Sequence, residues 1–168
     1  MVERIRSIRS DLGLTVSATT RSPREGEVDG VSYYFLTDEE FSNRIDNGEF
    51  VEWADVHGHK YGTLVSEVES KLASGTSLVL EIDVQGALQV KQKFPEAVLI
   101  FIAPPSLDEL RNRLVGRGTE SADAVKLRLA NAEAELALAQ RYDVTIVNDD
   151  LERAVEKLAA TLESFERN

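Results

Sequence analysis

Residues 16–35 read V-S-A-T-T-R-S-P-R-E-G-E-V-D-G-V-S-Y-Y-F, and the rest of the chain can be interpreted outward from this stretch. It follows an apolar run that favours a β-strand, and it places Arg21 and Arg24 three positions apart in a turn-rich segment with Pro23 and Gly26. Guanidinium groups match phosphate oxygens through pairs of hydrogen bonds, so a bound phosphate would explain the two arginines. Two solvated arginines on a loop are the alternative, and the stretch alone does not decide between them.

The composition is that of an ordinary folded domain, and it narrows the partners to be considered. The 168 residues are 42% hydrophobic and 29% charged, with a formal net charge of −11 and no cysteine. We expect one domain over residues 1–168, without disulfides or thiolate chemistry. The acidic balance argues against nucleic acid or an anionic membrane as the main partner. Because no apolar segment indicates secretion or membrane spanning, the expected location is the cytoplasm.

The second half of the chain alternates short apolar runs with helical patterns. The expected strands cover residues 77–82, 98–103 and 144–147, and the expected helices cover residues 84–93, 107–115, 122–140 and 151–165. Strands that are apolar along their whole length are typical of parallel sheets covered by helices on both faces, so the sequence predicts an α/β fold. Residues 19–63 are more polar and contain a hairpin pattern, and we expect them to form an inserted mixed lobe.

Within this lobe, strands are expected at residues 50–56 and 60–63, and they carry Glu52 and Thr63. A carboxylate matches the parallel N1–H and N2–H₂ donors of guanine, whereas adenine lacks the N1–H and would leave a buried carboxylate without its partner. The hydroxyls of Thr63 and Ser17 could serve the guanine O6 or a neighbouring edge. A solvated strand glutamate is the ordinary alternative for Glu52.

Three further side chains are candidates for nucleotide binding. Tyr33 and Tyr61 flank the lobe, and a phenol can donate to a phosphate oxygen, although packing is the commoner role of a half-buried tyrosine. Asp83 follows the apolar run 77–82, at the strand end where ligands bind in open parallel sheets. It could orient a nucleotide or hold magnesium through water, and it could also cap the following helix. These roles are compatible.

A second basic group consists of Arg113, Arg117 and Arg128. Glycines on both sides of Arg117 predict a lid region over residues 116–130, and arginines on a lid can neutralise charge on a transferring phosphoryl group. Ion pairs with neighbouring glutamates are the alternative. The two histidines of the chain lack a third ligand at metal spacing, so we expect no metal site built by the protein alone.

Together these pieces resemble the guanylate kinase family of nucleoside monophosphate kinases. The matching segments follow in order along nearly the whole chain: S-A-T-T-R-S-P-R-E-G-E-V-D-G-V-S-Y-Y-F, G-E-F-V-E-W-A, Y-G-T, E-I-D-V-Q-G-A, F-I-A-P-P-S, G-R-G-T-E and V-N-D-D-L. The resemblance implies a parallel sheet of the P-loop kinase type with an inserted GMP-binding lobe and a helical lid. It also implies transfer of the γ-phosphoryl group of ATP to GMP, a step of purine nucleotide metabolism.

The resemblance gives each candidate residue an expected role. GMP and ATP would be the small-molecule partners, with Mg²⁺ bridging the ATP phosphates. The guanine end would be addressed by Ser17, Glu52, Thr63 and Asp83, the GMP phosphate by Arg21, Arg24, Tyr33 and Tyr61, and the lid and donor phosphates by Arg113, Arg117 and Arg128.

The sequence departs from the family pattern at its beginning. The family opens with a strand and a G-x-x-x-x-G-K-[ST] loop, whose backbone N–H groups and lysine hold the ATP phosphates. No segment of this sequence matches that loop, and Met1 stands where the family is already inside the following helix. The expectation is therefore a fold without the first strand and the phosphate loop. A catalytically inactive module of the same family, binding GMP or phosphorylated peptides, is the alternative to a kinase.

Overall fold

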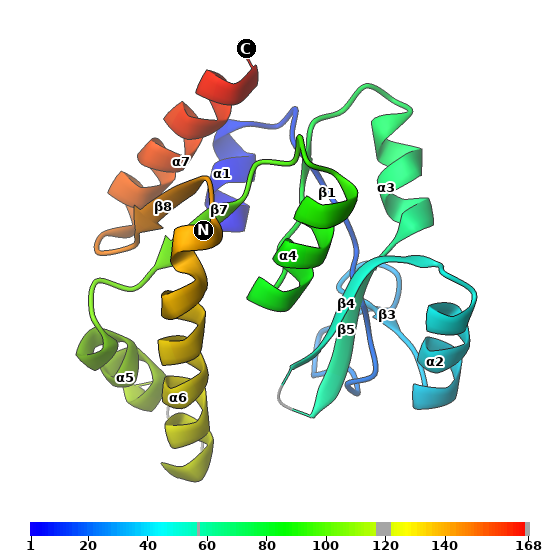
Figure 1. Ribbon diagram of the computed structural model, residues 1–168, viewed down its shortest axis with the longest axis horizontal. Coiled ribbons are helices and arrows are strands. Elements are labelled where there is room, and N and C mark those ends of the chain that lie inside the picture. Colours follow the sequence, from blue (N-terminus) through cyan, green and yellow to red (C-terminus); the bar gives the residue numbers. More distant parts are fainter. Residues whose placement is uncertain (57, 117–121, 167–168) are drawn as a thin grey trace. The chain divides into compact units, whose positions relative to one another are not determined.

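Figure 1 shows a computed structural model of the chain, in which residues 1–56, 58–116 and 122–166 are described. The chain divides into two units, and each is described by itself. The N-terminal unit consists of Val2 and Arg6–Ala97, and the C-terminal unit consists of Met1, Glu3–Ile5 and Val98–Asn168.

The N-terminal unit contains two sheets. In the smaller one, β1 (Gly13–Leu14) pairs in parallel with β6 (Leu78–Val79). The larger sheet has the strand order β3-β2-β5-β4, with bounds Ala18–Thr19 for β2, Tyr34–Phe35 for β3, Phe50–Val56 for β4 and His59–Leu64 for β5. Strand β2 is parallel to β3 and antiparallel to β5, so this sheet is mixed, as the sequence predicted for the lobe.

Residues 14–18 read L-T-V-S-A, a β-prone segment, and they are divided between these two sheets. Leu14 ends β1 and Ala18 begins β2, and the residues between them belong to neither strand. The backbone N–H of Val16 donates to the Glu67 carboxylate at 3.1 Å instead of to a neighbouring strand. A side-chain acceptor has therefore replaced a ladder hydrogen bond, which frees the chain to pass from one sheet to the other.

The β4–β5 hairpin forms where its sequence pattern predicted, and it contains one irregularity. The register shifts between Phe50 and Glu52, which places Val51 in a β-bulge. Phe50 stacks on the fully buried Phe41 with ring centroids 4.4 Å apart, whereas Val51 packs in a separate apolar cluster with Val68. The bulge thus lets two consecutive apolar residues reach different cores.

Two helices of this unit, α2 (Asp38–Asp46) and α4 (Val84–Lys93), begin at residues whose side chains cap them. The Thr37 hydroxyl accepts from the Glu40 backbone N–H at 3.1 Å while the Glu40 carboxylate accepts from the Thr37 N–H at 2.8 Å, and these two hydrogen bonds form a capping box. Asp83 caps α4, because its side chain accepts a hydrogen bond from the backbone N–H of Gly86 at 2.8 Å. Helix α3 has the bounds Val65–Leu72, whereas α1 (Val2–Ile8) has residues in both units.

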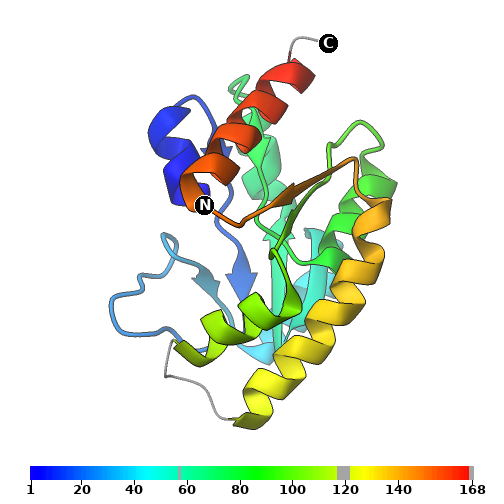
Figure 2. The same cartoon turned by 90° about the vertical axis from the view of Figure 1, so that its left-hand side faces the viewer.

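The C-terminal unit has one parallel strand pair and three α-helices among its described residues. Strand β7 (Ile100–Ala103) pairs with β8 (Val144–Val147) over all four positions. Helices α5 and α6 lie side by side (Figure 1, Figure 2), and Asp150 caps α7 by accepting from the Arg153 N–H at 3.0 Å. The bounds are Leu107–Gly116 for α5, Ala122–Leu138 for α6, Ala139–Arg141 for the 3₁₀ turn η1 and Leu151–Glu166 for α7.

The predicted parallel pairing is confirmed in both units, but the described strands do not form the single sheet that the sequence predicted. The β1–β6 and β7–β8 pairs form two separate two-stranded sheets, and the parallel β2–β3 pair belongs to the mixed sheet. In the run 77–82, only Leu78 and Val79 join a ladder. Leu78, Leu80 and Ile82 pack their side chains against the cluster around Val51. No helix in the described residues is long and apolar enough to cross a membrane.

Candidate functional site

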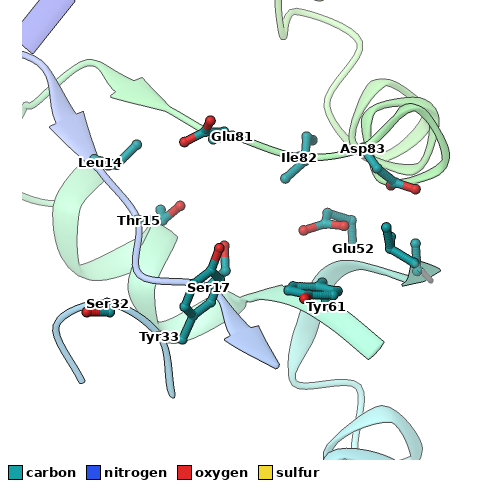
Figure 3. Close-up of a pocket in the computed structure, with 13 residues that line it drawn as sticks. Leu14, Thr15, Ser17, Ser32, Tyr33, Glu52, Tyr61, Glu81, Ile82 and Asp83 are labelled. Carbon is teal, nitrogen blue, oxygen red and sulfur yellow. The ribbon is translucent and has the colours of Figure 1, made fainter. Parts of the chain in front are cut away.

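A pocket of ≈ 250 Å³ lies in the N-terminal unit, where the crossover from β1 to β2, the β4–β5 hairpin and the segment before α4 meet (Figure 3). Five of the predicted site residues line it: Ser17, Tyr33, Glu52, Tyr61 and Asp83. The remaining lining residues are Leu14, Thr15, Ser32, Ala54, Val56, Gly62, Glu81 and Ile82. Side chains from distant parts of the sequence therefore converge on one cavity, as ligand sites require.

Glu52 is the most deeply buried acid of this pocket, with only 3% of its surface exposed. The Thr63 hydroxyl donates to its Oε1 at 2.6 Å, from the facing position of the hairpin. Burial raises the pKa of the Glu52 carboxyl, and the nearby charge of Asp83 adds to the rise, while the Thr63 hydroxyl opposes it. Figure 3 shows the carboxylate between Tyr61 and the 81–83 segment. A buried acceptor aimed into a cavity is suited to a ligand that carries hydrogen-bond donors.

Thr63 itself does not line the pocket. Its hydroxyl is fully buried and is already used on Glu52, so it orients the carboxylate instead of facing the cavity. Asp83 has the capping role that the sequence offered, through the N–H of Gly86, and it also lines the pocket. A capping carboxylate has its direction set by the helix start, which fixes where its second oxygen can reach.

An aromatic pair forms another wall of the pocket. The rings of Tyr33 and Tyr61 meet edge to face with centroids 6.0 Å apart, and burial raises the pKa of Tyr33. The Arg21 guanidinium carbon lies 5.3 Å from the Tyr33 ring centre. Arg21 is held there by Glu27, whose two oxygens each accept a hydrogen bond from it at 2.9 Å. This bidentate bond, followed by one to Tyr61, raises the pKa of Arg21, which stays a fixed positive charge.

Neither Arg21 nor Arg24 is among the residues that line the pocket, and Arg24 is the more exposed of the two. The Arg24 backbone N–H donates to Glu27 at 2.7 Å. Glu27 therefore organises the whole arginine segment, and sequence reasoning missed it. The sequence did carry a signal for Glu27, because an acid three residues after Arg24 can hydrogen-bond within a tight loop. In the structure Gly26 of that loop has φ of +85°.

Sequence reasoning also missed three polar residues that line the pocket, namely Thr15, Ser32 and Glu81. Glu81 stands two positions before Asp83, a spacing that puts two residues of an extended segment on one side. Thr15 stands two positions before Ser17 in the same way. Period-two spacing from residues already selected would have found both, whereas Ser32 carries no comparable signal.

The second basic group belongs to the C-terminal unit. Arg113, on α5, donates to Glu109 at 2.9 Å and to the backbone oxygen of Asn148 at 3.1 Å, so the ion pair that the sequence left as an alternative is present. Arg128 lies half-buried on α6. Arg117 lies outside the described residues, as do the other residues between the two helices.

Comparison with known proteins places the chain in one family. The family model described as "Guanylate kinase" matches residues 5–165. A guanylate kinase of Caldanaerobacter subterraneus subsp. tengcongensis is 52% identical over 152 residues, which cover 90% of this chain and 74% of the relative. One of Bacillus cereus is 51% identical over 146 residues, covering 87% and 71%.

The structural comparison agrees with the sequence comparison. The crystal structure of guanylate kinase from Anaplasma phagocytophilum matches with a TM-score of 0.80 and 36% identity, over 95% of this chain and 78% of that one. A match of this extent at this identity reflects common ancestry as well as a common fold. On the strength of its family match, its relatives and its fold, the chain belongs to the guanylate kinase family.

Proposed function

We propose that this chain transfers the γ-phosphoryl group of ATP to GMP, giving ADP and GDP, and that the pocket of the N-terminal unit holds GMP. The observation that carries the proposal is the buried Glu52 carboxylate, oriented by Thr63 and facing a cavity. A buried acceptor of this kind needs a ligand with matching donors, and a guanine supplies two in parallel.

The guanine end of GMP would be read by hydrogen bonds to Glu52. The carboxylate accepts from the N1–H and the N2–H₂ of guanine, while Ser17 and Asp83 contribute further polar contacts from the pocket wall. Adenine presents no N1–H, so AMP would leave the buried carboxylate unsatisfied at a cost of about 1–3 kcal/mol or more. Thr63 acts through Glu52, since its hydroxyl is committed to that carboxylate.

The phosphate of GMP would be bound at the aromatic wall. Tyr33 and Tyr61 offer phenolic donors from the pocket, and Arg21 provides a charged donor that Glu27 holds beside Tyr33. Arg24 is exposed in the same loop, where it can reach a phosphate by rotating its own side chain. Because Glu27 already orients the Arg21 side chain, little conformational freedom is lost when the phosphate binds.

The donor side of the reaction involves Arg113, Arg117 and Arg128 in this proposal, acting on the phosphates of ATP and on the transferring group. In phosphoryl transfer, positioning and neutralisation of charge supply most of the catalysis. The absence of a first strand and phosphate loop stays a prediction, as do the boundaries of the lobe at 19–63 and of the lid at 116–130.

Mg²⁺ would enter with ATP and neutralise charge on its phosphates. Among the residues that the structure describes, no group of three His, Cys, Asp or Glu side chains could hold a metal ion. Mg²⁺ in phosphoryl-transfer sites is held mostly by phosphate oxygens and water, with one or two carboxylates at most. Asp83 and Glu81 are the carboxylates of the pocket edge that can approach it through water.

The composition supports further parts of the proposal. The net charge of −11 disfavours nucleic acid and anionic membranes as partners, and it is compatible with a cytoplasmic enzyme of purine nucleotide metabolism.

The test is ADP release from ATP by this chain with GMP, with AMP as the control substrate. GMP-dependent release without AMP-dependent release is the expected result. GMP binding, followed by the fluorescence of the single tryptophan, Trp53, gives a second readout that does not need turnover. GMP binding without ADP release would contradict phosphoryl transfer and favour the inactive module, and failure of GMP to bind would contradict the pocket assignment as well.

A further inference from the structure

One face of α4 runs along strand β4 at the position of Glu52. Gly86, Gln89 and Lys93 are spaced three and four residues apart, which places them on the same side of the helix. We call these three residues the α4 stripe. Strand β4 is the edge strand of the mixed sheet, so one row of its backbone groups has no strand partner in that sheet. Gln89 and Lys93 of the α4 stripe form hydrogen bonds with backbone groups of β4.

Gln89 takes the place of a missing strand at Trp53, the residue after Glu52. Its amide oxygen accepts from the Trp53 N–H at 3.2 Å, and its amide nitrogen donates to the Trp53 carbonyl at 2.7 Å. One primary amide thus reproduces both hydrogen bonds that a neighbouring strand would make. A glutamine is suited to this because its donor and acceptor lie side by side.

Lys93 holds the backbone on the other side of Glu52. Its Nζ donates to the carbonyl of Phe50 at 3.2 Å and to that of Val51 at 2.5 Å, at the β-bulge. A bulge is a point where the ladder cannot fix the chain, since one residue is left without a partner. The lysine supplies that fixation, so Glu52 lies between two backbone positions that α4 holds.

Gly86 leaves the space that the Glu52 carboxylate occupies. A Cβ added at this position would overlap Oε2 of Glu52 and lie 2.9 Å from its Cδ. The φ of Gly86 is not in the left-handed region, so the backbone itself tolerates alanine. The glycine is therefore required by the position of the carboxylate and not by the helix.

We propose that the α4 stripe sets the preference of the pocket for guanine by holding Glu52 in register with the N1–H and N2–H₂ donors. Gln89 and Lys93 are positioning residues that act through the β4 backbone, and Gly86 acts by leaving room for the carboxylate. The inference rests on the proposed function, because it assumes that Glu52 contacts guanine.

The principal test is Gln89→Leu, with Gln92→Leu as the matched control. Leucine keeps much of the volume and loses both hydrogen bonds, whereas Gln92 is exposed on another side of the same helix. Affinities for GMP and for IMP, which lacks the 2-amino group, are measured by calorimetry so that no signal depends on Trp53. We expect Gln89→Leu to weaken GMP binding about tenfold and IMP binding about twofold, which narrows the GMP preference about fivefold.

Turnover separates positioning from general damage. In Gln89→Leu the KM for GMP should rise about tenfold while kcat at saturating GMP stays within about twofold, because only the contact with the base is disturbed. Gln92→Leu should match the unsubstituted chain in every measurement. Equal losses for GMP and IMP, or a fall in kcat with KM unchanged, would overturn the inference.

Gly86→Ala provides an independent test in case Gln89→Leu does not fold. Alanine favours a helix over glycine but its Cβ overlaps the buried Glu52 carboxylate, so the thermal midpoint should fall only modestly, while the displaced Glu52 weakens GMP binding at least tenfold. A variant that is stable and keeps the GMP preference would refute the role of Gly86. If the unsubstituted chain binds no GMP, the proposed function fails first, and that result is distinct from an unchanged preference in the variants.

Discussion

Replacement of Glu52 by glutamine tests the central feature of the site. The substitution keeps the shape of a side chain that is only 3% exposed and that accepts from Thr63 at 2.6 Å, while it removes the charge and turns one acceptor into a donor. When guanine binds, the variant loses one of the two hydrogen bonds that the carboxylate accepts, and its amide NH₂ faces an N–H donor of the base. A charge-assisted hydrogen bond and an unsatisfied donor together cost about 3 kcal/mol, so the KM for GMP should rise about 150-fold.

The same substitution should stabilise the protein in the absence of nucleotide at neutral pH. Burial raises the pKa of Glu52 above its ordinary value of 4.5, so ionisation of this group opposes folding. In the unsubstituted chain the contribution of Glu52 to stability is fully kept below about pH 4.5 and falls as the pH rises through the higher folded-state pKa. Glutamine has no such dependence. Its advantage in unfolding free energy should therefore be largest at and above neutral pH and should shrink toward acid.

Two assays check this prediction. Coupled measurement of ADP release gives the KM for GMP, and AMP is the comparison substrate, whose poor use should improve because the variant no longer leaves a buried carboxylate unpaired. Thermal or urea unfolding of the nucleotide-free proteins between about pH 5 and about pH 8 gives the difference in stability and its sign. A Glu52→Gln protein with an unaltered KM for GMP, or one less stable than the parent at neutral pH, would refute the reasoning.

Other substitutions probe the frame around this site. Phe41→Ala should lower the free energy of unfolding by about 3–5 kcal/mol, because Phe41 is fully buried and stacked on Phe50, and urea titration would show it as a lower midpoint with an unchanged slope. Gly62→Ala would bring a Cβ within 2.8 Å of both a backbone oxygen and the Phe50 ring, so we expect a loss of about 1–3 kcal/mol, and wild-type thermal stability would contradict this. Glu27→Gln should weaken the grip on Arg21 and raise the KM for GMP about fivefold with kcat nearly unchanged, whereas an unaltered KM would remove Glu27 from the site.

The sequence determined the local elements and the chemistry available to them. The start of α2 followed from Thr37 and Glu40, and the start of α4 followed from Asp83, because a cap depends on residues within one helical turn. The strands at 50–56 and 144–147 and the parallel pairing of the latter followed from apolar patterns of the kind that buried strands show. Glu52, Tyr33 and Tyr61 of the pocket could also be selected from the sequence, because the residue type limits which ligand groups a side chain can bind.

Only the tertiary structure decided how those side chains are held. The division of run 14–18 between two sheets depends on Glu67, and the β-bulge beside Glu52 depends on Lys93, which lies more than forty residues away in sequence. The double hydrogen bond of Gln89 to the edge strand is of the same kind. Such contacts join residues with no local signal for each other, because they form only when packing brings a helix against a strand. Local sequence therefore predicts which groups can read a base, whereas long-range packing determines where they point.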